Sequence, residues 1–260
     1  MLQVQNLSIR QARNGRAPLV QNVSFDLREH RCLTLVGETG SGKSLIARAL
    51  AGILPSGLER EGKIKFNGRE CYGRIMNGAA GEIFLMPQES ALALNPSMSI
   101  LSQVAEVFRW PLGKGRLQSR KLAGQTLNML GLFKTRQYPH QLSGGMCQRS
   151  MLAMALASPA RLVIADEPTK GLDAGLKKDV VGLLAGLTEK GKAVLCITHD
   201  FSVARELGGL VAVMLKGKSV EQGPAEKVLS RPAHEYTRAL IGALPENGLI
   251  PWSENPAEIK

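Results

Sequence analysis

A glycine-rich stretch followed by lysine and serine constrains the fold of this chain more than any other feature. Residues 37–44 read Gly37, Glu38, Thr39, Gly40, Ser41, Gly42, Lys43 and Ser44. The apolar run 31–36 before them predicts a buried strand, and residues 44–52 after them predict a helix that stops at Gly52. Small residues let backbone N–H groups curl around an anion, and the helix directs its positive end toward the same point. The sequence therefore predicts an anion site between a buried strand and a helix.

The spacing G-x-x-x-x-G-K-S resembles the phosphate-binding loop of nucleoside triphosphatases. In such a loop Lys43 places a positive charge beside the β- and γ-phosphates, and the Ser44 hydroxyl takes one coordination position of Mg²⁺. We therefore expect ATP and Mg²⁺ as cofactors. A chance glycine-rich turn is the alternative, but the expected strand and helix on either side of the stretch argue against it.

Two adjacent carboxylates follow a second apolar run. Residues 162–165 predict a buried strand that ends in Asp166 and Glu167. Ligands bind at the carboxyl ends of strands in open α/β sheets. Asp166 can hold Mg²⁺ through water, and Glu167 can polarise the water that attacks a phosphate. An apolar run followed by Asp-Glu is a weak signal by itself and becomes strong beside the phosphate-binding loop.

The order of apolar segments predicts the fold class. Residues 2–9 and 19–27 alternate apolar and polar side chains, which predicts an N-terminal antiparallel β region. Short apolar runs at 83–86, 162–165, 193–197 and 210–214 alternate with helical segments, which predicts an α/β fold with a mainly parallel sheet. Apolar residues repeat at helical spacing between 97 and 142. We expect a nucleotide-binding domain over 1–246, with a helical subdomain inserted at about 89–158, and a loose tail over 247–260.

A third motif indicates the family. Residues 142–149 read Leu-Ser-Gly-Gly-Met-Cys-Gln-Arg and precede an apolar helix, and Ser143 suits the N-cap of that helix. Together with Gly144 and Gly145, this start resembles the L-S-G-G-Q signature of the ATP-binding-cassette (ABC) ATPases. The resemblance covers nearly the whole chain and implies a P-loop ATPase core. It also implies that Ser143–Gly145 close over ATP held by a second ABC ATPase subunit, in a homodimer or heterodimer.

The resemblance assigns further residues by position. Gln88, after the run 83–86, matches the Q-loop glutamine that contacts Mg²⁺ and the attacking water. His199, in Ile-Thr-His-Asp after the run 193–197, matches the switch histidine that senses the γ-phosphate. Asp173 matches the D-loop at the dimer interface. The resemblance thus implies Glu167, His199 and Gln88 as catalytic residues.

Two segments narrow the resemblance. Residues 94–96 read Leu-Asn-Pro, and residues 231–240 are close to a P-x-H-P-Y-T-R-A-L pattern. Both resemble the ATPases of peptide, nickel and opine-metallophore importers. For 231–240 an ordinary amphipathic helix is the alternative. The Ser-Gly-Gly-Met variant of the signature and the short C-terminus most resemble the nickel-type importer ATPases. This resemblance implies two kinds of partner, a pair of integral-membrane permease subunits and an external solute-binding protein. It also implies a peripheral location on the cytoplasmic face of the cell membrane.

Some positions depart from the family pattern. Met146 replaces the signature glutamine, and residues 8–13 contain no aromatic side chain that could stack on adenine. Arg10 or Arg13 could stack there instead. Cys147 lies in the first turn of a basic helix start. It is either a reactive thiol with a lowered pKa or a small buried apolar residue, and the second is the more frequent case.

The charge distribution leaves partners open. The chain has 260 residues and a net charge of +11, and residues 107–165 contain no acidic side chain. Such a basic stretch can be a solvated face, or it can contact a membrane surface or a nucleic acid. The single cassette and sparse aromatics argue against a nucleic-acid partner, and none is expected. A soluble complex resembling the carbon–phosphorus lyase assembly is the other alternative. With no apolar run of about 18 residues and no cysteine framework, we expect an intracellular protein without its own membrane span.

Overall fold

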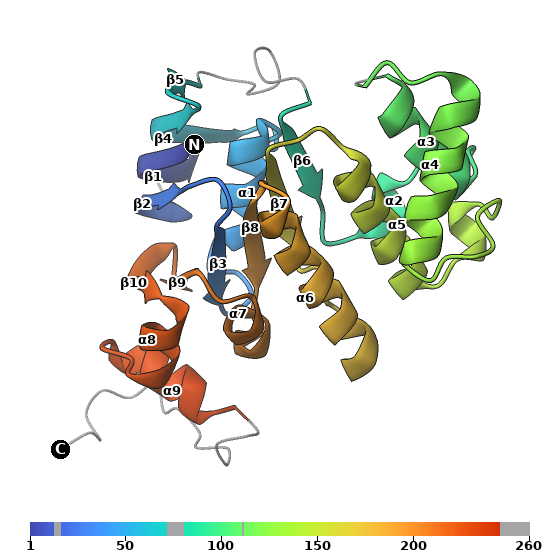
Figure 1. Ribbon diagram of the computed structural model, residues 1–260. Coiled ribbons are helices and arrows are strands. Elements are labelled where there is room, and N and C mark those ends of the chain that lie inside the picture. The colour runs from blue at the N-terminus through green and yellow to red at the C-terminus, as the bar shows by residue number, and fades with distance from the viewer. Residues whose placement is uncertain (13–16, 72–80, 111, 245–260) are drawn as a thin grey trace.

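The computed structural model describes residues 1–12, 17–71, 81–110 and 112–244, and its centre is a six-stranded sheet (Figure 1). The strands lie in the order β10-β9-β3-β8-β7-β6, and all neighbours are parallel except the pair β10–β9. Their bounds are β3 Cys32–Gly37, β6 Ile83–Met86, β7 Leu162–Asp166, β8 Ala193–Thr198, β9 Leu210–Leu215 and β10 Lys218–Pro224. The expected mainly parallel sheet is confirmed.

A second sheet of four antiparallel strands is formed mainly by the N-terminal part of the chain. Its order is β2-β1-β4-β5, with β1 at Leu2–Gln11, β2 at Val20–Leu27, β4 at Leu58–Phe66 and β5 at Arg69–Glu70. The predicted antiparallel region is thereby confirmed. The first part of β4 pairs with β1, and apart from the partly buried Leu58 its residues 59–61 are polar and at least partly exposed.

Two apolar clusters explain why the central strands read as unbroken apolar runs. Ile164 and Leu195 face the cluster that also contains α1 (Lys43–Ala51) and the antiparallel sheet. Val163 and Val194 face the opposite cluster, which contains α6 (Ala174–Glu189). Parallel strands covered on both faces bury every side chain, so alternation disappears from their sequence.

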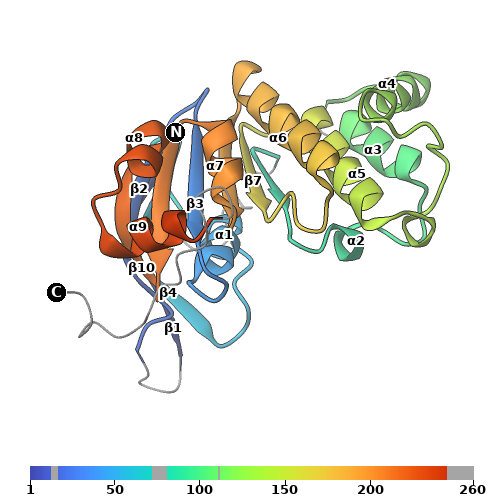
Figure 2. The same ribbon diagram turned by 90° about the horizontal axis from the view of Figure 1, so that it is seen from below.

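Four helices follow β6 and lie together on one side of the central sheet (Figures 1 and 2). They are α2 Ser90–Ala93, α3 Ile100–Arg109, α4 Arg116–Met129 and α5 Gly144–Ala157, with a 3₁₀ turn at Pro139–Gln141. Helical segments were predicted from the apolar spacing between residues 97 and 142, and α3 and α4 lie within these bounds. The helices pack on each other and, through α5, on α6 and β6.

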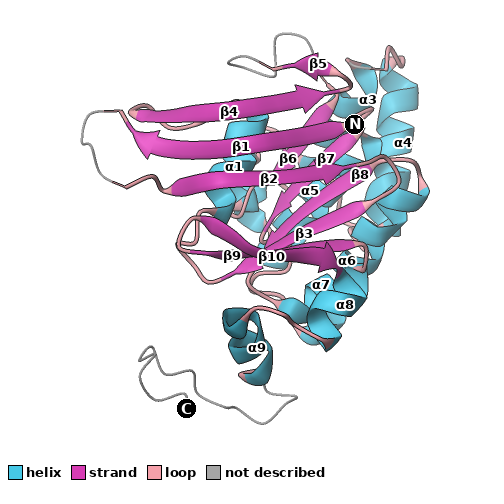
Figure 3. Ribbon diagram, turned by 90° about the vertical axis from the view of Figure 1, so that its left-hand side faces the viewer, coloured by secondary structure: helices cyan, strands magenta, loops and turns pink. Residues whose placement is uncertain are grey.

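The C-terminal part returns to the central sheet. After α7 (Phe201–Leu207) and β9, strand β10 turns back antiparallel and leads into α8 (Ala225–Ser230) and α9 (Glu235–Gly242), as Figures 1 and 3 show. The expected tail at 247–260 lies outside the described residues. No helix in the described part has both the length and the apolar character needed to cross a bilayer.

The central strands should dominate stability. Leu195 in β8 is fully buried, whereas Leu117 in α4 is 87% exposed. We expect Leu195→Ala to lower the free energy of unfolding by about 2–5 kcal/mol, because it leaves a cavity in the core. The same change at Leu117 should stay within about 0.5 kcal/mol. Urea unfolding of both variants measures this, and equal losses would contradict the buried position of β8.

Candidate functional site

The loop 37–44 connects β3 to α1 and contains backbone conformations that favour glycine. Gly37 has φ of 151°, and a Cβ placed there would lie 2.2 Å from the carbonyl oxygen of Met214. Gly42 has φ of 98°, and its Cβ would lie 2.9 Å from Val20. Both glycines are therefore required by close backbone approach and by the left-handed conformation. The loop is held between β9 and β2.

Lys43 is buried in the first turn of α1 and is held by the loop. Its Nζ donates to the carbonyl oxygens of Gly37 at 2.7 Å and Glu38 at 2.8 Å, and to Ser41 Oγ at 3.3 Å. Burial lowers the pKa of Lys43, while the carboxylates of Glu167 and Asp166 act in the opposite direction. Because the Lys43 ammonium group is largely removed from water, its attraction to a bound phosphate is stronger than it would be in solvent.

Ser44 and Asp166 meet across 122 residues of sequence. Ser44 Oγ donates to Asp166 Oδ1 at 3.1 Å, which joins α1 to the end of β7. Burial raises the pKa of Asp166, and the Ser44 hydrogen bond partly offsets this. The structure therefore brings together the two oxygen groups predicted to hold Mg²⁺.

Ser44 Oγ and Asp166 Oδ1 fit two ligand positions of a magnesium ion whose other ligands are phosphate and water. Mg²⁺ prefers octahedral oxygen ligands at about 2.1 Å, which places neighbouring ligands about 3 Å apart. Across the described residues, no group of three or more His, Cys, Asp or Glu side chains could hold a metal. Ser44 and Asp166 thus fit Mg²⁺ that binds with phosphate and water rather than in a complete protein cage.

Glu167 and His199 form the second pair of the site. His199 Nδ1 lies 3.0 Å from both Oε1 and Oε2 of Glu167, and Thr198 Oγ1 donates to Glu167 Oε2 at 3.4 Å. The two residues follow β7 and β8, which are neighbours in the sheet. Because β7 and β8 are parallel, their carboxyl ends lie at the same edge of the sheet. The contact between Glu167 and His199 therefore follows from the order of the strands.

A cavity of about 170 Å³ lies between these groups. Its lining combines the loop, the start of α1 and two residues from other strand ends: Thr39, Gly40, Gly42, Lys43, Ser44, Leu45, Gln88 and Glu167. The predicted residues Gln88 and Glu167 therefore lie together with the phosphate-binding loop, as the sequence indicated.

The signature residues lie elsewhere. Ser143 is the N-cap of α5 and its Oγ accepts from the N–H of Met146 at 3.3 Å, with Gly144 and Gly145 beginning the helix. Asp173 is the N-cap of α6 and accepts from the N–H of Leu176 at 3.0 Å. None of these four lines the cavity beside Lys43, and Figures 1 and 2 show α5 apart from α1.

Sequence reasoning missed a charged contact beside His199. Lys177 on α6 forms an ion pair with Asp200 and donates to Ser202 Oγ at 2.7 Å. Asp200 also caps α7 by accepting from the N–H of Ser202 at 2.8 Å. The helix start after Asp200 was a usable signal for the cap, but nothing in the sequence identified Lys177 as its partner.

Burial and pairing bear on two alternatives that the sequence left open, the state of Cys147 and the role of Arg10. Cys147 is buried and burial raises its pKa, which favours the apolar interpretation over the reactive thiol. Arg10 pairs with Glu61 at 2.8 Å and lies 3.9 Å from Glu59, so its guanidinium is engaged on β4. The other candidate for stacking on adenine, Arg13, lies outside the described residues.

Comparison with known proteins gives two family matches. Residues 20–170 match the family described as ABC transporter, and residues 220–255 match the C-terminal region of oligopeptide/dipeptide transporters. The peptidoglycan transport ATP-binding protein YejF of Agrobacterium fabrum is 37% identical over 95% of this chain, which spans 47% of that relative. The dipeptide transport ATP-binding protein DppD of Escherichia coli is 36% identical over 87% of this chain and 72% of its own length.

A solved structure supports the same relationship. The ATP-binding cassette MJ0796, solved as a dimer in a post-hydrolysis state with ADP and Pi, superposes with a TM-score of 0.75. The match covers 86% of this chain and 99% of the solved chain at 26% identity. The cassette fold predicted from the order of motifs is therefore confirmed.

The Lys177–Asp200 pair should make stability depend on pH. Burial raises the pKa of Asp200, but the hydrogen bonds from Lys177 and Ser202 outweigh it, so the net pKa is lowered. A lowered pKa in the folded state stabilises the protein above the unfolded value of about 3.9, and this contribution is lost as the pH falls through the folded pKa.

We therefore expect Lys177→Met to lower the unfolding free energy at pH 7 by about 1–2 kcal/mol. The deficit should shrink on acidification below about pH 4. Lys178→Met, at the exposed neighbouring position, is the matched control and should change little. Denaturant unfolding at pH 7 and pH 3 checks this, and a deficit that does not depend on pH would contradict the ion-pair account.

Proposed function

Because the chain belongs to the ABC transporter family, whose cassettes hydrolyse ATP, we propose that it is the ATP-hydrolysing subunit of a bacterial importer for small peptides. The observation that carries the proposal is the single cavity that joins Lys43, Ser44, Gln88 and Glu167. It combines a phosphate-binding loop with a carboxylate placed to act on water. These are the parts that an in-line phosphoryl transfer to water requires.

The loop residues bind and orient the nucleotide. Backbone N–H groups of residues 37–44 and the start of α1 face the phosphates, and Lys43 Nζ exchanges its bonds to the Gly37 and Glu38 carbonyls for phosphate oxygens. Ser44, Asp166 and Gln88 are the proposed holders of Mg²⁺, which, when bound, neutralises charge on the phosphate oxygens. Buried Asp166 favours this cation, because burial destabilises an unpaired carboxylate.

Glu167 and His199 act on the attacking water. Glu167 is 8% exposed and lines the cavity, so its carboxylate can accept a proton from water held above the phosphates. His199 Nδ1 fixes the orientation of that carboxylate from the side of β8. In this assignment His199 holds Glu167 in place and, on phosphate binding, can donate a hydrogen bond to the γ-phosphate.

A second ABC ATPase subunit completes the site. Ser143, Gly144, Gly145 and Asp173 lie outside the cavity of their own chain, yet α5 begins with exposed N–H groups suited to a phosphate. A homodimer or heterodimer in which each chain offers this start to the other's nucleotide explains their position. The solved relative MJ0796 is itself dimeric.

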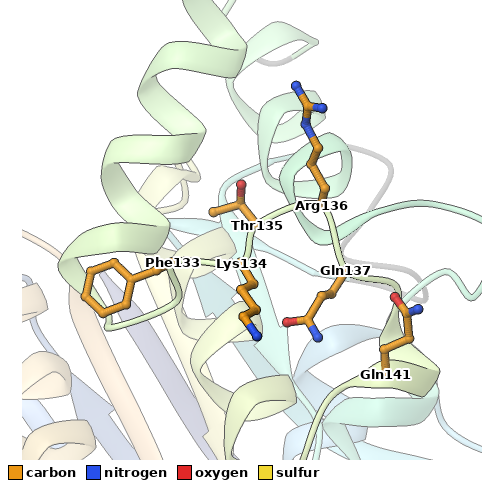
Figure 4. A pocket seen from close by; sticks show the side chains of 6 residues that line it. All are labelled: Phe133, Lys134, Thr135, Arg136, Gln137 and Gln141. Carbon is orange, nitrogen blue, oxygen red and sulfur yellow. The ribbon is translucent and has the colours of Figure 1, made fainter.

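The helical part is the proposed contact with two integral-membrane permease subunits on the cytoplasmic face of the membrane. Residues 107–165 carry nine basic and no acidic side chains. Leu117, Phe133 and Trp110 are 87%, 77% and 73% exposed. A pocket of about 450 Å³ lies on the loop before α5. Figure 4 shows Lys134 and Gln137 extending to one side of this loop and Arg136 to the other. Exposed apolar side chains among cations favour a protein and membrane contact over a purely solvated face.

The cargo assignment rests on the relatives. YejF and DppD are named for peptidoglycan and dipeptide transport, and residues 220–255 match a region described for oligopeptide and dipeptide transporters. Among the cargoes that the sequence resemblance left open, this supports a peptide over nickel or an opine metallophore. In such a system an external solute-binding protein delivers the cargo.

The decisive variant for the proposed chemistry is Glu167→Gln. It should retain MgATP binding and reduce the hydrolysis rate by about 100-fold or more, because the carboxylate that accepts the proton is lost. It should also accumulate as an ATP-bound dimer. Glu189→Gln, at the exposed end of α6, is the matched control and should hydrolyse at the wild-type rate. Wild-type turnover by Glu167→Gln in a phosphate-release assay would refute the assignment.

The proposed membrane-facing surface is tested by reversing its charge. Arg116→Glu, Arg120→Glu and Lys121→Glu together should weaken cosedimentation with phosphatidylglycerol vesicles at low salt, because they remove attraction to anionic headgroups. Lys63, Lys190 and Lys218 are exposed and lie on β4, after α6 and on β10, so their combined reversal changes net charge equally away from this surface. If both triple variants lose binding equally, only net charge matters and the proposed surface is wrong.

A further inference from the structure

The ring of His199 contacts Glu167 but is not enclosed by the core. Its side chain is 57% exposed, and its Nδ1 lies 3.0 Å from both carboxylate oxygens of Glu167. Because packing does not surround this ring, its position depends on the backbone that carries it. That backbone is the turn 198–202, which joins the end of β8 to the start of α7.

One hydroxyl in this turn connects Asp200 with Glu167. Thr198 is fully buried, and its Oγ1 accepts from the N–H of Asp200 at 3.1 Å. The same oxygen donates its only hydrogen to Glu167 Oε2, at 3.4 Å. Thr198 and Asp200 are the two chain neighbours of His199. The backbone position of Asp200 therefore bears on Glu167 as well as on His199.

Lys177 holds Asp200 from a neighbouring helix. Its ammonium group forms an ion pair with Asp200 and donates to Ser202 Oγ at 2.7 Å. Ser202 in turn donates to Asp200 Oδ1, through its hydroxyl at 2.6 Å and its N–H at 2.8 Å. The side chains of the ion pair are only 26% and 30% exposed, so solvent screens it less than a surface salt bridge. The three residues form a closed network that joins α6 to the turn.

Lys177 itself lies away from the nucleotide site. It does not line the cavity that contains Lys43 and Glu167. Its helix α6 shares an apolar cluster with α7, through Val180 on α6 and Val203 on α7. Any influence of Lys177 on the reaction must therefore pass through Asp200 and the turn.

We propose that Lys177 is a positioning residue for ATP hydrolysis, because it fixes the turn that places His199 against Glu167. The inference rests on the proposed function, in which Glu167 and His199 act on the attacking water. Small displacements of catalytic groups lower a reaction rate steeply, because the reaction requires one geometry. Lys177 touches neither the phosphates nor the water and acts by way of Asp200.

A purely structural role for Lys177 predicts a different result. If the ion pair only stabilises the fold, a variant that remains folded should hydrolyse MgATP at the wild-type rate. Lys177→Met removes the charge and keeps an unbranched side chain, whereas Lys177→Arg keeps a cation that can pair with a carboxylate. Lys178→Met, at the exposed next position of α6, is the matched control.

The first measurement separates turnover from binding in the full chain. Hydrolysis of MgATP is followed by phosphate release, and affinity by calorimetric titration with the magnesium complex of the non-hydrolysable analogue AMP-PNP. For Lys177→Met we expect kcat to fall about tenfold or more, the factor of one charge-assisted hydrogen bond, and the dissociation constant to change by less than about twofold. Lys177→Arg should recover most of the rate, and Lys178→Met should match the wild type.

The second measurement reports on His199 directly. The chain contains four histidines, so a histidine-labelled sample gives few ring signals in an NMR spectrum. The signal of His199, identified by its loss in His199→Gln, should move in Lys177→Met and stay in place in Lys178→Met. The ring signals of the other three histidines should stay in place in both variants.

Urea unfolding verifies that each variant is folded under the assay conditions. If Lys177→Met does not fold, Ser202→Ala takes its place, because it removes one acceptor of Lys177 and keeps the ion pair; its loss of kcat should be smaller. An unchanged kcat, an equal loss in Lys177→Arg, or an unmoved His199 signal would overturn the inference alone. If the wild-type chain does not hydrolyse MgATP, or if Glu167→Gln hydrolyses it at the wild-type rate, the proposed function fails and the inference fails with it.

Discussion

The hydrogen bond between Ser44 and Asp166 is the contact on which the site depends. It joins two residues 122 positions apart, and it exists because β3 and β7 both pair with β8 in parallel register. In a parallel sheet the carboxyl ends of the strands meet at one edge, so each strand delivers its following residue to the same place. Glu167 reaches the cavity by this route, and His199 reaches Glu167 from the end of the neighbouring strand. The order of the strands thus places the side chains of the site next to one another. The two apolar clusters that cover the faces of the sheet stabilise this strand order.

Glu167 carries a conformational cost that fits this location. Its φ is 51°, a left-handed conformation that costs a residue with a side chain about 1–2 kcal/mol. The turn is held because the N–H of Glu167 donates to the carbonyl oxygen of Ile197 at 2.8 Å. Directly after β7 the chain therefore bends away from the strand direction, and the carboxylate is aimed at the cavity and at His199. Strain of this kind persists where the surrounding structure fixes it, and here the neighbouring strand β8 does so.

Much of the fold and of the cavity could be predicted from the sequence, because strongly buried strands leave continuous apolar runs. Residues 162–165 and 193–197 were found for this reason, and the loop 37–44 has a spacing that few other structures require. The segments that were missed lack such a signal. Strand β10 is at the edge of the sheet and only partly buried, so Lys218–Pro224 reads as polar. Lys177 binds Asp200 through tertiary packing of α6 on α7, and no local pattern records that partner.

The position of the helix start at Ser143 relative to the cavity fits the dimer proposed above. Its lining comes from the loop, from Gln88 and from Glu167, and all of these belong to the sheet edge or to the segment directly after β6. The helix start at Ser143 sits on the helical part, and Gly145 already packs closely against Leu172, at 3.0 Å from where its Cβ would be. Since α5 packs on α6 and β6 within its own chain, it cannot rotate onto the loop without breaking that core. In the proposed dimer, closure over the phosphates comes from a second chain, so that nucleotide binding and subunit association would favour each other.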